Sequence, residues 1–363
     1  NILVKQIGVG KLAIFIHQED WVCTNAHGID LKVAEESVKT SLSKFKQLTR
    51  LGNNKNELAN HFDVVVPVYH KEFPLAFTFL GQLRADAPFI LDEKLNYIQT
   101  IASIIAVAIE NKKLFRAHMK QKLMKSELEM AGQMQTMLIP GKLPDDERIS
   151  LAGIYLPHQE VGGDYYDYIQ LSADESLFCI GDISGKGVAA ALLMANFQAS
   201  VRSYSEQQPS LHALIESLNA RVNEITNGEK YITLFLAKFN FTTRELQYVN
   251  AGHNPALLYH QGEIKLLQEG CTILGMFEKL PYVNVQSLKL EHEFITFCYT
   301  DGLTDVENDF KETLGTEDII SFIEKNHQLS PSRLNKKIVD YLVAFKGKRL
   351  INDDISMLTC KIY

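Results

Sequence analysis

The sequence has few cysteines and none of the paired spacings that serve cross-links or zinc. The five cysteines carry no CxxC pair, and they are Cys23, Cys179, Cys271, Cys298 and Cys360. An odd, scattered set excludes a disulfide framework and a zinc site of the CxxC type. We therefore expect reduced core thiols in a cytoplasmic protein.

The sequence also lacks long apolar runs and an excess of basic residues over acidic ones. No segment approaches the roughly 18 apolar residues of a membrane span, and no secretory signal is present. The formal net charge of −7 argues against a general binder of nucleic acid or of anionic membranes. The 363 residues allow two domains and a linker. Because the chain begins with Asn1 rather than Met, we expect it to be cut from a longer one.

Residues 1–91 are expected to form a small α/β domain. The β-branched and aromatic content predicts strands at 11–16, 64–69 and 75–80. The mixed polar and apolar spacing of residues 33–49 predicts a surface helix.

Residues 92–140 predict one long helix, because proline is absent before Pro140 and Gly132 is the one glycine. Apolar residues recur every three or four positions, with one register shift, at Ile98, Ile101, Ile105, Ala108, Phe115, Met119, Leu123, Met130, Met134 and Met137. One interpretation is an amphipathic helix that covers its own domain. At 1.5 Å per residue, however, the helix is about 70 Å long, which exceeds one small domain. We favour a coiled-coil connector that forms a homodimer.

Residues 141–363 predict a second domain, rich in strands and with helices in pairs. Strands are expected at 151–155, 176–183, 231–240, 245–251, 256–260, 294–299 and 355–362, and helices at 187–204, 210–226, 317–326 and 332–345. This order fits an α+β fold, in which a β-sandwich is flanked by helices.

Four aspartates lie in separate short motifs where strand-like sequence meets a turn. The motifs are Val161-Gly-Gly-Asp-Tyr-Tyr-Asp167 with Asp164, Ile180-Gly-Asp-Ile-Ser-Gly-Lys-Gly187 with Asp182, Tyr299-Thr-Asp-Gly302 with Asp301, and Asn352-Asp-Asp-Ile-Ser356 with Asp353. Carboxylates at apolar strand ends are costly unless a positive group balances them, and no Arg or Lys stands beside each one. A pair of Mg²⁺ or Mn²⁺ ions would balance them. Taken singly, each motif is also explained by an ordinary turn.

The segment 178–187 is the most informative of these. An apolar strand ends at Asp182, Gly185 and Gly187 allow a tight turn, and a helix follows at once. Asp182 is placed to bridge two metal ions, and the carbonyl of Ile183 would add a backbone oxygen. A phosphate-binding loop is disfavoured, because the glycine spacing is one residue short and Gly187 stands where Ser or Thr is needed.

The order of the motifs resembles the SpoIIE-like branch of the metal-dependent (PPM, type 2C) serine/threonine phosphatases. The matching motifs are GGDYYD, GDISGKGVAAALLMA, YVNAGHNPALL, YTDGLTDV and NDDIS, within residues 125–363. The resemblance implies a β-sandwich with helices outside, two Mn²⁺ or Mg²⁺ ions, and a phosphoserine or phosphothreonine protein as substrate. It also implies direct attack of a metal-activated water on phosphorus.

Residue by residue, Asp182 resembles the ligand that bridges both metals, with Ile183 offering its carbonyl. Asp164 resembles the acid of the first family motif, and Asp301 and Asp353 resemble the later acids that bind the second metal. Asp354 ranks below Asp353, because the wider class often has Asn there. The substrate-binding candidates are Lys186 and His253. For Lys186 the alternative is a plain surface lysine, and for His253 it is a structural hydrogen bonder.

The first domain resembles a GAF domain, through the Ala-Ile-Glu-Asn sequence near the end of its closing helix at 98–115. Such domains often sense small molecules or dimerise. The combined expectation is a signal-regulated dimeric phosphatase that acts on a phosphorylated STAS-domain anti-sigma-factor antagonist or a similar regulator. The alternatives are a non-catalytic phosphatase-like scaffold, which the intact acids disfavour, and a GAF ligand sensor that binds a partner.

Overall fold

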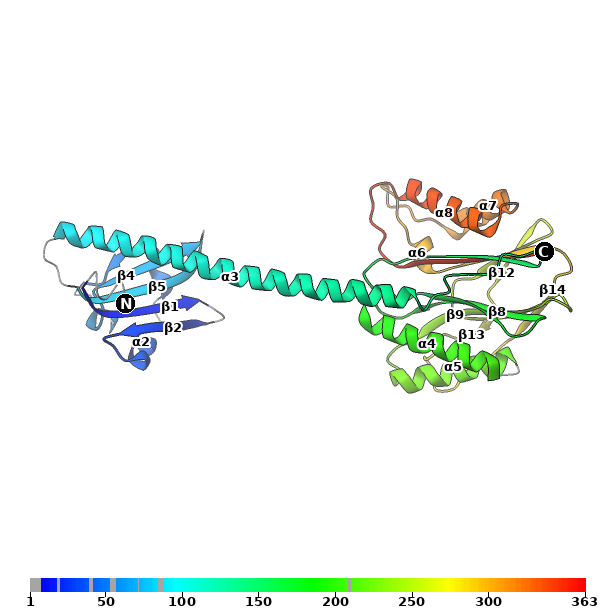
Figure 1. The fold of residues 1–363 in the computed structure, drawn as a ribbon, viewed down its shortest axis with the longest axis horizontal. Helices are drawn as coiled ribbons and strands as arrows, with labels where there is room; N and C mark the ends of the chain where they lie inside the picture. The colour runs from blue at the N-terminus through cyan, green and yellow to red at the C-terminus, as the bar shows by residue number, and fades with distance from the viewer. Residues whose placement is uncertain are drawn as a thin grey trace. The chain divides into compact units, whose positions relative to one another are not determined.

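The computed structural model describes residues 8–17, 20–38, 42–52, 57–70, 72–83, 88–207 and 210–363. The chain divides into two compact units, residues 1–122 and 123–363 (Figure 1). Within these described ranges, no helix is both long and apolar enough to cross a lipid bilayer. The finer division into 1–91, 92–140 and 141–363 stays a prediction.

The first unit contains an antiparallel five-stranded sheet with the strand order β2-β1-β5-β4-β3. The strands are β1 (Val9–His17), β2 (Trp21–His27), β3 (Thr49–Arg50), β4 (Val64–His70) and β5 (Phe73–Leu83). An aromatic cluster with Phe15, Phe62 and Phe79 fills one face of the sheet. Leu95 and Ile98 of helix α3 pack on the other face.

The expected helix at 33–49 is wrong over its second half. Helix α2 spans Leu31–Val38, and a 3-10 turn (Leu42–Lys44) and strand β3 follow. Residues 39–41 of the expected helix lie outside the described residues. Strand β2 was not predicted, because its sequence has no regular alternation of polar and apolar residues, and Thr24, Asn25 and His27 are exposed. A second 3-10 turn spans Glu57–Asn60.

Helix α3 (Pro88–Thr136) is the long helix that the sequence predicts. Its early turns cover the first sheet, with Ala106 also buried. Its exposed large apolar side chains among the described residues are Tyr97, Ile104, Ile105, Val107, Ile109, Leu114, Phe115, Met119, Leu123, Met124, Met130 and Met134. A role for α3 as a connector between two copies stays a prediction.

The second unit is a sandwich of two sheets. The first sheet has the order β13-β10-β9-β8-β7, with β14 paired to β10, and the second has the order β12-β11-β15-β16-β6. The strands are β6 (Ile149–Leu156), β7 (Tyr165–Gln170), β8 (Glu175–Ile183), β9 (Ile232–Asn240), β10 (Glu245–Ala251), β11 (Ala256–His260), β12 (Glu263–Leu267), β13 (Gly270–Cys271), β14 (Gln286–Lys289), β15 (Phe294–Tyr299) and β16 (Ile355–Ile362). The rings of Phe239 and Phe294, from opposite sheets, lie 5.3 Å apart in the core between them.

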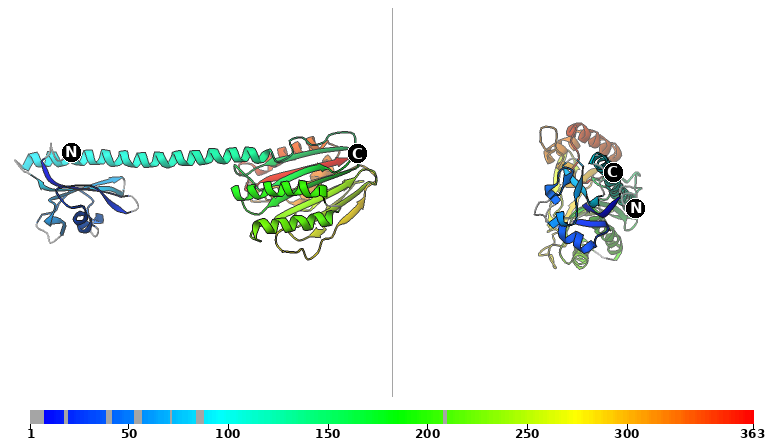
Figure 2. Two further views of the ribbon diagram at one scale, coloured as in Figure 1. Left: turned by 60° about the horizontal axis from the view of Figure 1, so that its bottom comes forward. Right: turned by 90° about the vertical axis from the view of Figure 1, so that its left-hand side faces the viewer.

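Helices cover both outer faces of this sandwich. Helices α4 (Val188–Gln207) and α5 (Leu211–Thr226) lie on the first sheet, and α7 (Thr316–Asn326) and α8 (Pro331–Lys346) lie on the second (Figures 1 and 2). The predicted sandwich flanked by helices is therefore present. Strands β7, β12, β13 and β14 and the short helix α6 (Asp301–Thr304) were not predicted.

Candidate active site

Two of the four predicted acids meet at one edge of the first sheet. Strands β7 and β8 are antiparallel, with Tyr165 opposite Gly181. Asp164, just before β7, and Asp182, near the end of β8, therefore lie at the same end. Gly163 permits this close approach, because a Cβ atom there would lie 2.8 Å from the Ile183 carbonyl oxygen and 3.5 Å from Asp182 Oδ1.

The second sheet brings the other two acids to the same region. Strand β15 ends before Asp301, the first residue of α6, and β16 begins just after the Asp353-Asp354 pair. The two strands are antiparallel, with Tyr299 opposite Met357. The buried Thr300 hydroxyl links the sheets, because it donates a 2.8 Å hydrogen bond to Asp164 Oδ2 and accepts one of 2.9 Å from the Ser356 amide.

The acids are close enough to shift one another's proton affinity. Burial, followed by Asp301, Asp353 and Asp354, raises the pKa of Asp182 to about 7. Asp164 is 2% exposed, and burial together with Asp182 raises its pKa well above the usual range. The pKa of Asp301 is raised by burial and then by Asp305 and Asp353. Such mutual repulsion is relieved when a cation lies among the acids.

The donors fit a hard divalent cation that keeps part of its water shell. No three His, Cys, Asp or Glu side chains among the described residues group tightly enough to hold an ion by themselves. Mg²⁺ usually binds through one or two carboxylates and retains several waters. Carboxylates with the nearby Ile183 carbonyl offer only oxygen ligands, which is the preference of Mg²⁺ and Mn²⁺.

Asp354 holds the loop that leads to Asp164. Its Oδ1 accepts a 2.7 Å hydrogen bond from the His158 amide, and its Oδ2 accepts one of 2.8 Å from the Gly163 amide. A side chain at Gly162 would overlap this carboxylate. The sequence ranked Asp354 below Asp353 as a ligand, and it carried no signal for this contact with a loop so distant along the chain.

Lys186 lies beside the acids. Its ammonium is 3.0 Å from Asp353 Oδ2 and donates a 3.1 Å hydrogen bond to the Asn352 carbonyl. The exposed Lys230, which the sequence did not single out, approaches the same loop, since a Cβ atom on Gly185 would lie 2.7 Å from its Nζ. Lys230 follows α5 in the chain, and nothing in the sequence around it indicates that it lies near Gly185.

His253 lies beneath the site rather than on its surface. The residue is 7% exposed, and its Nδ1 is 2.8 Å from the Thr233 hydroxyl. Thr233 in turn stands opposite Asp182 in the β8–β9 pair. Burial lowers the pKa of His253 to about 4. Direct contact with a protein substrate stays a prediction that this buried position does not favour.

Comparison with known proteins identifies the second unit. The family model described as Stage II sporulation protein E (SpoIIE) matches residues 172–363, which is more than half of the chain. The chain belongs to the SpoIIE family. The sandwich fold agrees with the SiaA-PP2C domain of Pseudomonas aeruginosa at a TM-score of 0.59 and 18% identity, over 67% of this chain and 99% of that one.

Curated relatives of this SpoIIE-family chain include two bacterial proteins. The phosphoserine phosphatase RsbU of Bacillus subtilis (strain 168) is 27% identical over 66% of this chain and 71% of its own length. The protein IcfG of Synechocystis sp. is 26% identical over 70% of this chain, which spans only 44% of that protein. The chain is a protein serine/threonine phosphatase, and its second unit has the fold of a PP2C domain.

Asp167, the second acid of the GGDYYD motif, is paired with an arginine. Asp167 is 0% exposed, and Arg202 of α4 donates two hydrogen bonds of 2.7 Å to its carboxylate. Asp167 is therefore a buried, paired acid and not a solvated one. No Arg lies near Asp164 in the sequence, and in the fold the guanidinium of Arg202 is engaged by Asp167.

Proposed function

We propose that this phosphatase hydrolyses phosphoserine or phosphothreonine on a regulatory protein, with two divalent cations held by Asp164, Asp182, Asp301 and Asp353. The observation that carries the proposal is the meeting of acids from four separate segments. Burial, together with these acids, raises the pKa of Asp182 to about 7. Such a shift at a group of acids is typical of functional sites.

The residues have distinct proposed roles. Asp182 would serve as a ligand of both ions, and the Ile183 carbonyl would add one oxygen ligand. When bound, Mn²⁺ or Mg²⁺ would supply an activated water and offset charge on the phosphoryl oxygens. Thr300 orients Asp164 through its 2.8 Å hydrogen bond. Lys186, beside Asp353, offers a positive charge for the phosphate.

Hydrolysis of p-nitrophenyl phosphate with and without Mn²⁺ tests this chemistry. We expect Mn²⁺-dependent turnover that Asp182→Ala abolishes, together with Mn²⁺ binding measured by calorimetry. Asp340→Ala, which removes an exposed acid on α8, is the matched control and should leave both unchanged. An Asp182→Ala chain that kept most of its turnover would overturn the assignment.

The same measurement separates the alternative function. A non-catalytic scaffold with a phosphatase-like fold would give no turnover in the wild-type chain under any metal. A GAF ligand sensor that binds a partner is compatible with catalysis, and it would show itself as ligand binding by the first unit. The acids at all four motif positions favour the enzyme.

The proposal extends to partner and regulation. RsbU is named a phosphoserine phosphatase, and by family resemblance the substrate is a phosphorylated STAS-domain anti-sigma-factor antagonist or a similar regulator. In this proposal residues 1–91 form a GAF-like sensor, 92–140 a dimeric coiled-coil connector and 141–363 the catalytic domain. Dephosphorylation of a phosphoserine STAS protein, followed by phosphate-affinity electrophoresis, tests the substrate class. Turnover of the small ester alone would reject that class.

A further inference from the structure

The last turns of α3 hold the loop that carries Asp164. Gln135 is buried, at 5% exposure, and its side-chain amide pairs with both polar groups of Gly162. Gln135 Nε2 donates to the Gly162 carbonyl at 2.6 Å, and Gln135 Oε1 accepts from the Gly162 amide at 3.1 Å. One side chain thus satisfies the backbone N–H and C=O groups of Gly162, a buried residue two positions before Asp164. Without it, these two groups would carry an uncompensated desolvation cost.

Two more contacts lie on the same face of the helix. Gly132 packs so closely on the loop that a Cβ atom there would overlap the Glu160 carbonyl. Lys125 lies 3.6 Å from the Glu160 carboxylate. Positions 125, 132 and 135 are seven and three residues apart, so they share one side of α3.

The other end of this loop touches the proposed metal site. Gly163, the next residue after Gly162, donates to Asp354 and approaches the Ile183 carbonyl. The two adjacent glycines are therefore fixed from opposite sides, Gly162 by the helix and Gly163 by the acids. Because Gly162 and Gly163 are joined by one peptide bond, a movement of the helix that displaces Gly162 would also displace Gly163 and its contacts with the acids.

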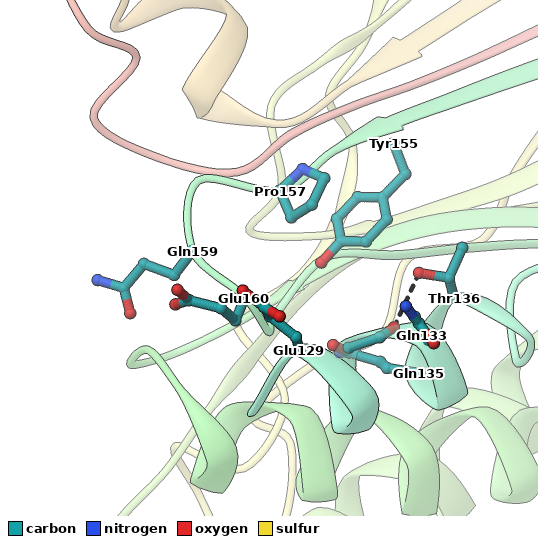
Figure 3. A pocket seen from close by; sticks show the side chains of 9 residues that line it. Glu129, Gln133, Gln135, Thr136, Tyr155, Pro157, Gln159 and Glu160 are labelled. Atoms are coloured by element: carbon teal, nitrogen blue, oxygen red, sulfur yellow. Dashed lines mark hydrogen bonds between the residues drawn. The ribbon is translucent and has the colours of Figure 1, made fainter. Parts of the chain in front are cut away.

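The space around these contacts is not filled by a hydrophobic core. A pocket of about 350 Å³ opens beside these contacts, and its lining includes Glu129, Gln133, Tyr155, Pro157 and Gln159 (Figure 3). The Tyr155 hydroxyl is buried there without a hydrogen-bond partner among the described residues. The loop is therefore held on the helix side by the Gln135 and Gly132 contacts and at the acids by Asp354.

We propose that Gln135 is a positioning residue that sets the loop 158–164 and, through it, the metal affinity of the site. A displacement of the end of α3 would then move the loop and, with it, the acids of the site. The inference rests on the proposed role of Asp164 as a metal ligand. It makes metal affinity, rather than the chemical step, the quantity that α3 controls.

The test uses the full chain and two methionine variants of the same helix. Gln135→Met keeps the volume but loses both hydrogen bonds, whereas Gln133→Met changes an exposed side chain at the rim of the same cavity. Residues that support metal ligands typically contribute 10–100-fold to affinity. We expect Gln135→Met to weaken Mn²⁺ binding about 10-fold by calorimetry, with turnover largely restored at saturating Mn²⁺, and Gln133→Met to bind as the wild type does.

A purely structural role would lower the unfolding temperature of Gln135→Met and leave its Mn²⁺ affinity within twofold of the wild type, which would overturn the proposal. Hydrogen exchange of the wild-type chain gives a second measurement should the variant not fold. Because coupling is reciprocal, Mn²⁺ should slow exchange in peptides covering both 158–164 and 129–137. Protection of the loop alone would also overturn it. A wild-type chain that binds no Mn²⁺ would instead refute the two-metal function itself.

Discussion

At the residue scale, two aspartates of one short motif have opposite environments. Asp167 has the Arg202 guanidinium as its partner, while Asp164 lies beside the Thr300 hydroxyl, Ser356 and the neighbouring acids Asp182 and Asp354. The first pair is a satisfied structural contact. The second arrangement brings acids together without a basic side chain beside Asp164, so the acids raise one another's pKa. Such a group of acids is typical of a functional site and suits a cation.

The raised pKa of Asp182 gives a pH prediction for the metal-free chain. The fold favours its protonated form, so its stabilising contribution is fully present below the ordinary pKa of 3.8 and is lost as pH rises through about 7. The Asp182→Asn variant has no carboxyl group that titrates at this position, so it lacks this pH-dependent contribution to stability. In EDTA, the unfolding temperature of the variant minus that of the wild type should therefore grow from pH 5 to pH 8.

The titration of His253 does not affect this difference in unfolding temperature. Its lowered pKa, about 4, removes stability as pH falls below about 6.5, but it is present in both chains and cancels. Differential scanning fluorimetry across the pH range provides the measurement. Parallel curves for the two chains would mean that Asp182 is not held in its protonated form by its neighbours.

Arg202 gives a prediction on stability. Replacing it with Met leaves the fully buried Asp167 carboxylate without its cation, which should cost about 3 kcal/mol of unfolding free energy. Arg221→Met is the control, because its partner Glu224 is 69% exposed and such surface pairs contribute little to stability. Urea unfolding measures both. Equal effects would contradict the assignment of the Asp167 pair as a buried one.

At the scale of elements, the site depends on where helix and strand ends meet. The antiparallel pairs β7–β8 and β15–β16 each deliver two acids to one end of the sandwich. Helix α3 adds Gln135 from outside the sandwich. The close contact of α3 with the loop at Glu160 is possible because Gly132 has no side chain.

Gly132→Ala tests that contact. Gly to Ala inside a helix normally stabilises by about 1 kcal/mol, but here the new Cβ would overlap a backbone carbonyl, so we expect a net loss of about 1–2 kcal/mol. Gly141→Ala has nothing within 4 Å and should change stability by less than about 0.5 kcal/mol. A higher unfolding temperature for Gly132→Ala would show that α3 and the loop are not in contact.

At the scale of the whole molecule, α3 leaves an unusual amount of apolar surface exposed. Leu114 is 58% exposed, Phe115 64% and Met119 49%. A helix seam of this kind is stable in water when a second helix covers it. This supports the homodimer that the helical periodicity predicts.

Sedimentation velocity tests the dimer. We expect the wild-type chain to sediment as a dimer and Phe115→Glu to shift toward the monomer, because a carboxylate in a helix seam is costly to bury. His118→Glu, which introduces the same charge at another exposed position of the helix, is the matched control. If both variants behave as the wild type does, α3 is not the dimer interface.

The sequence by itself determined the long helix, most strands of the sandwich and the four acidic motifs. It could do so because periodicity, turn residues and motif spacing are local properties of the chain. It missed β7 beside Asp164, and it extended the helix at 33–49 too far, because a short strand or a polar helical pattern is decided by the neighbours it packs against.

Only the tertiary structure decided which groups meet. Thr300 against Asp164, Asp354 against Gly163, Arg202 against Asp167 and Gln135 against Gly162 join segments far apart in the chain. No local pattern encodes such pairs, since hydrogen bonds and charge interactions act over a few ångströms of space and take no account of separation along the sequence.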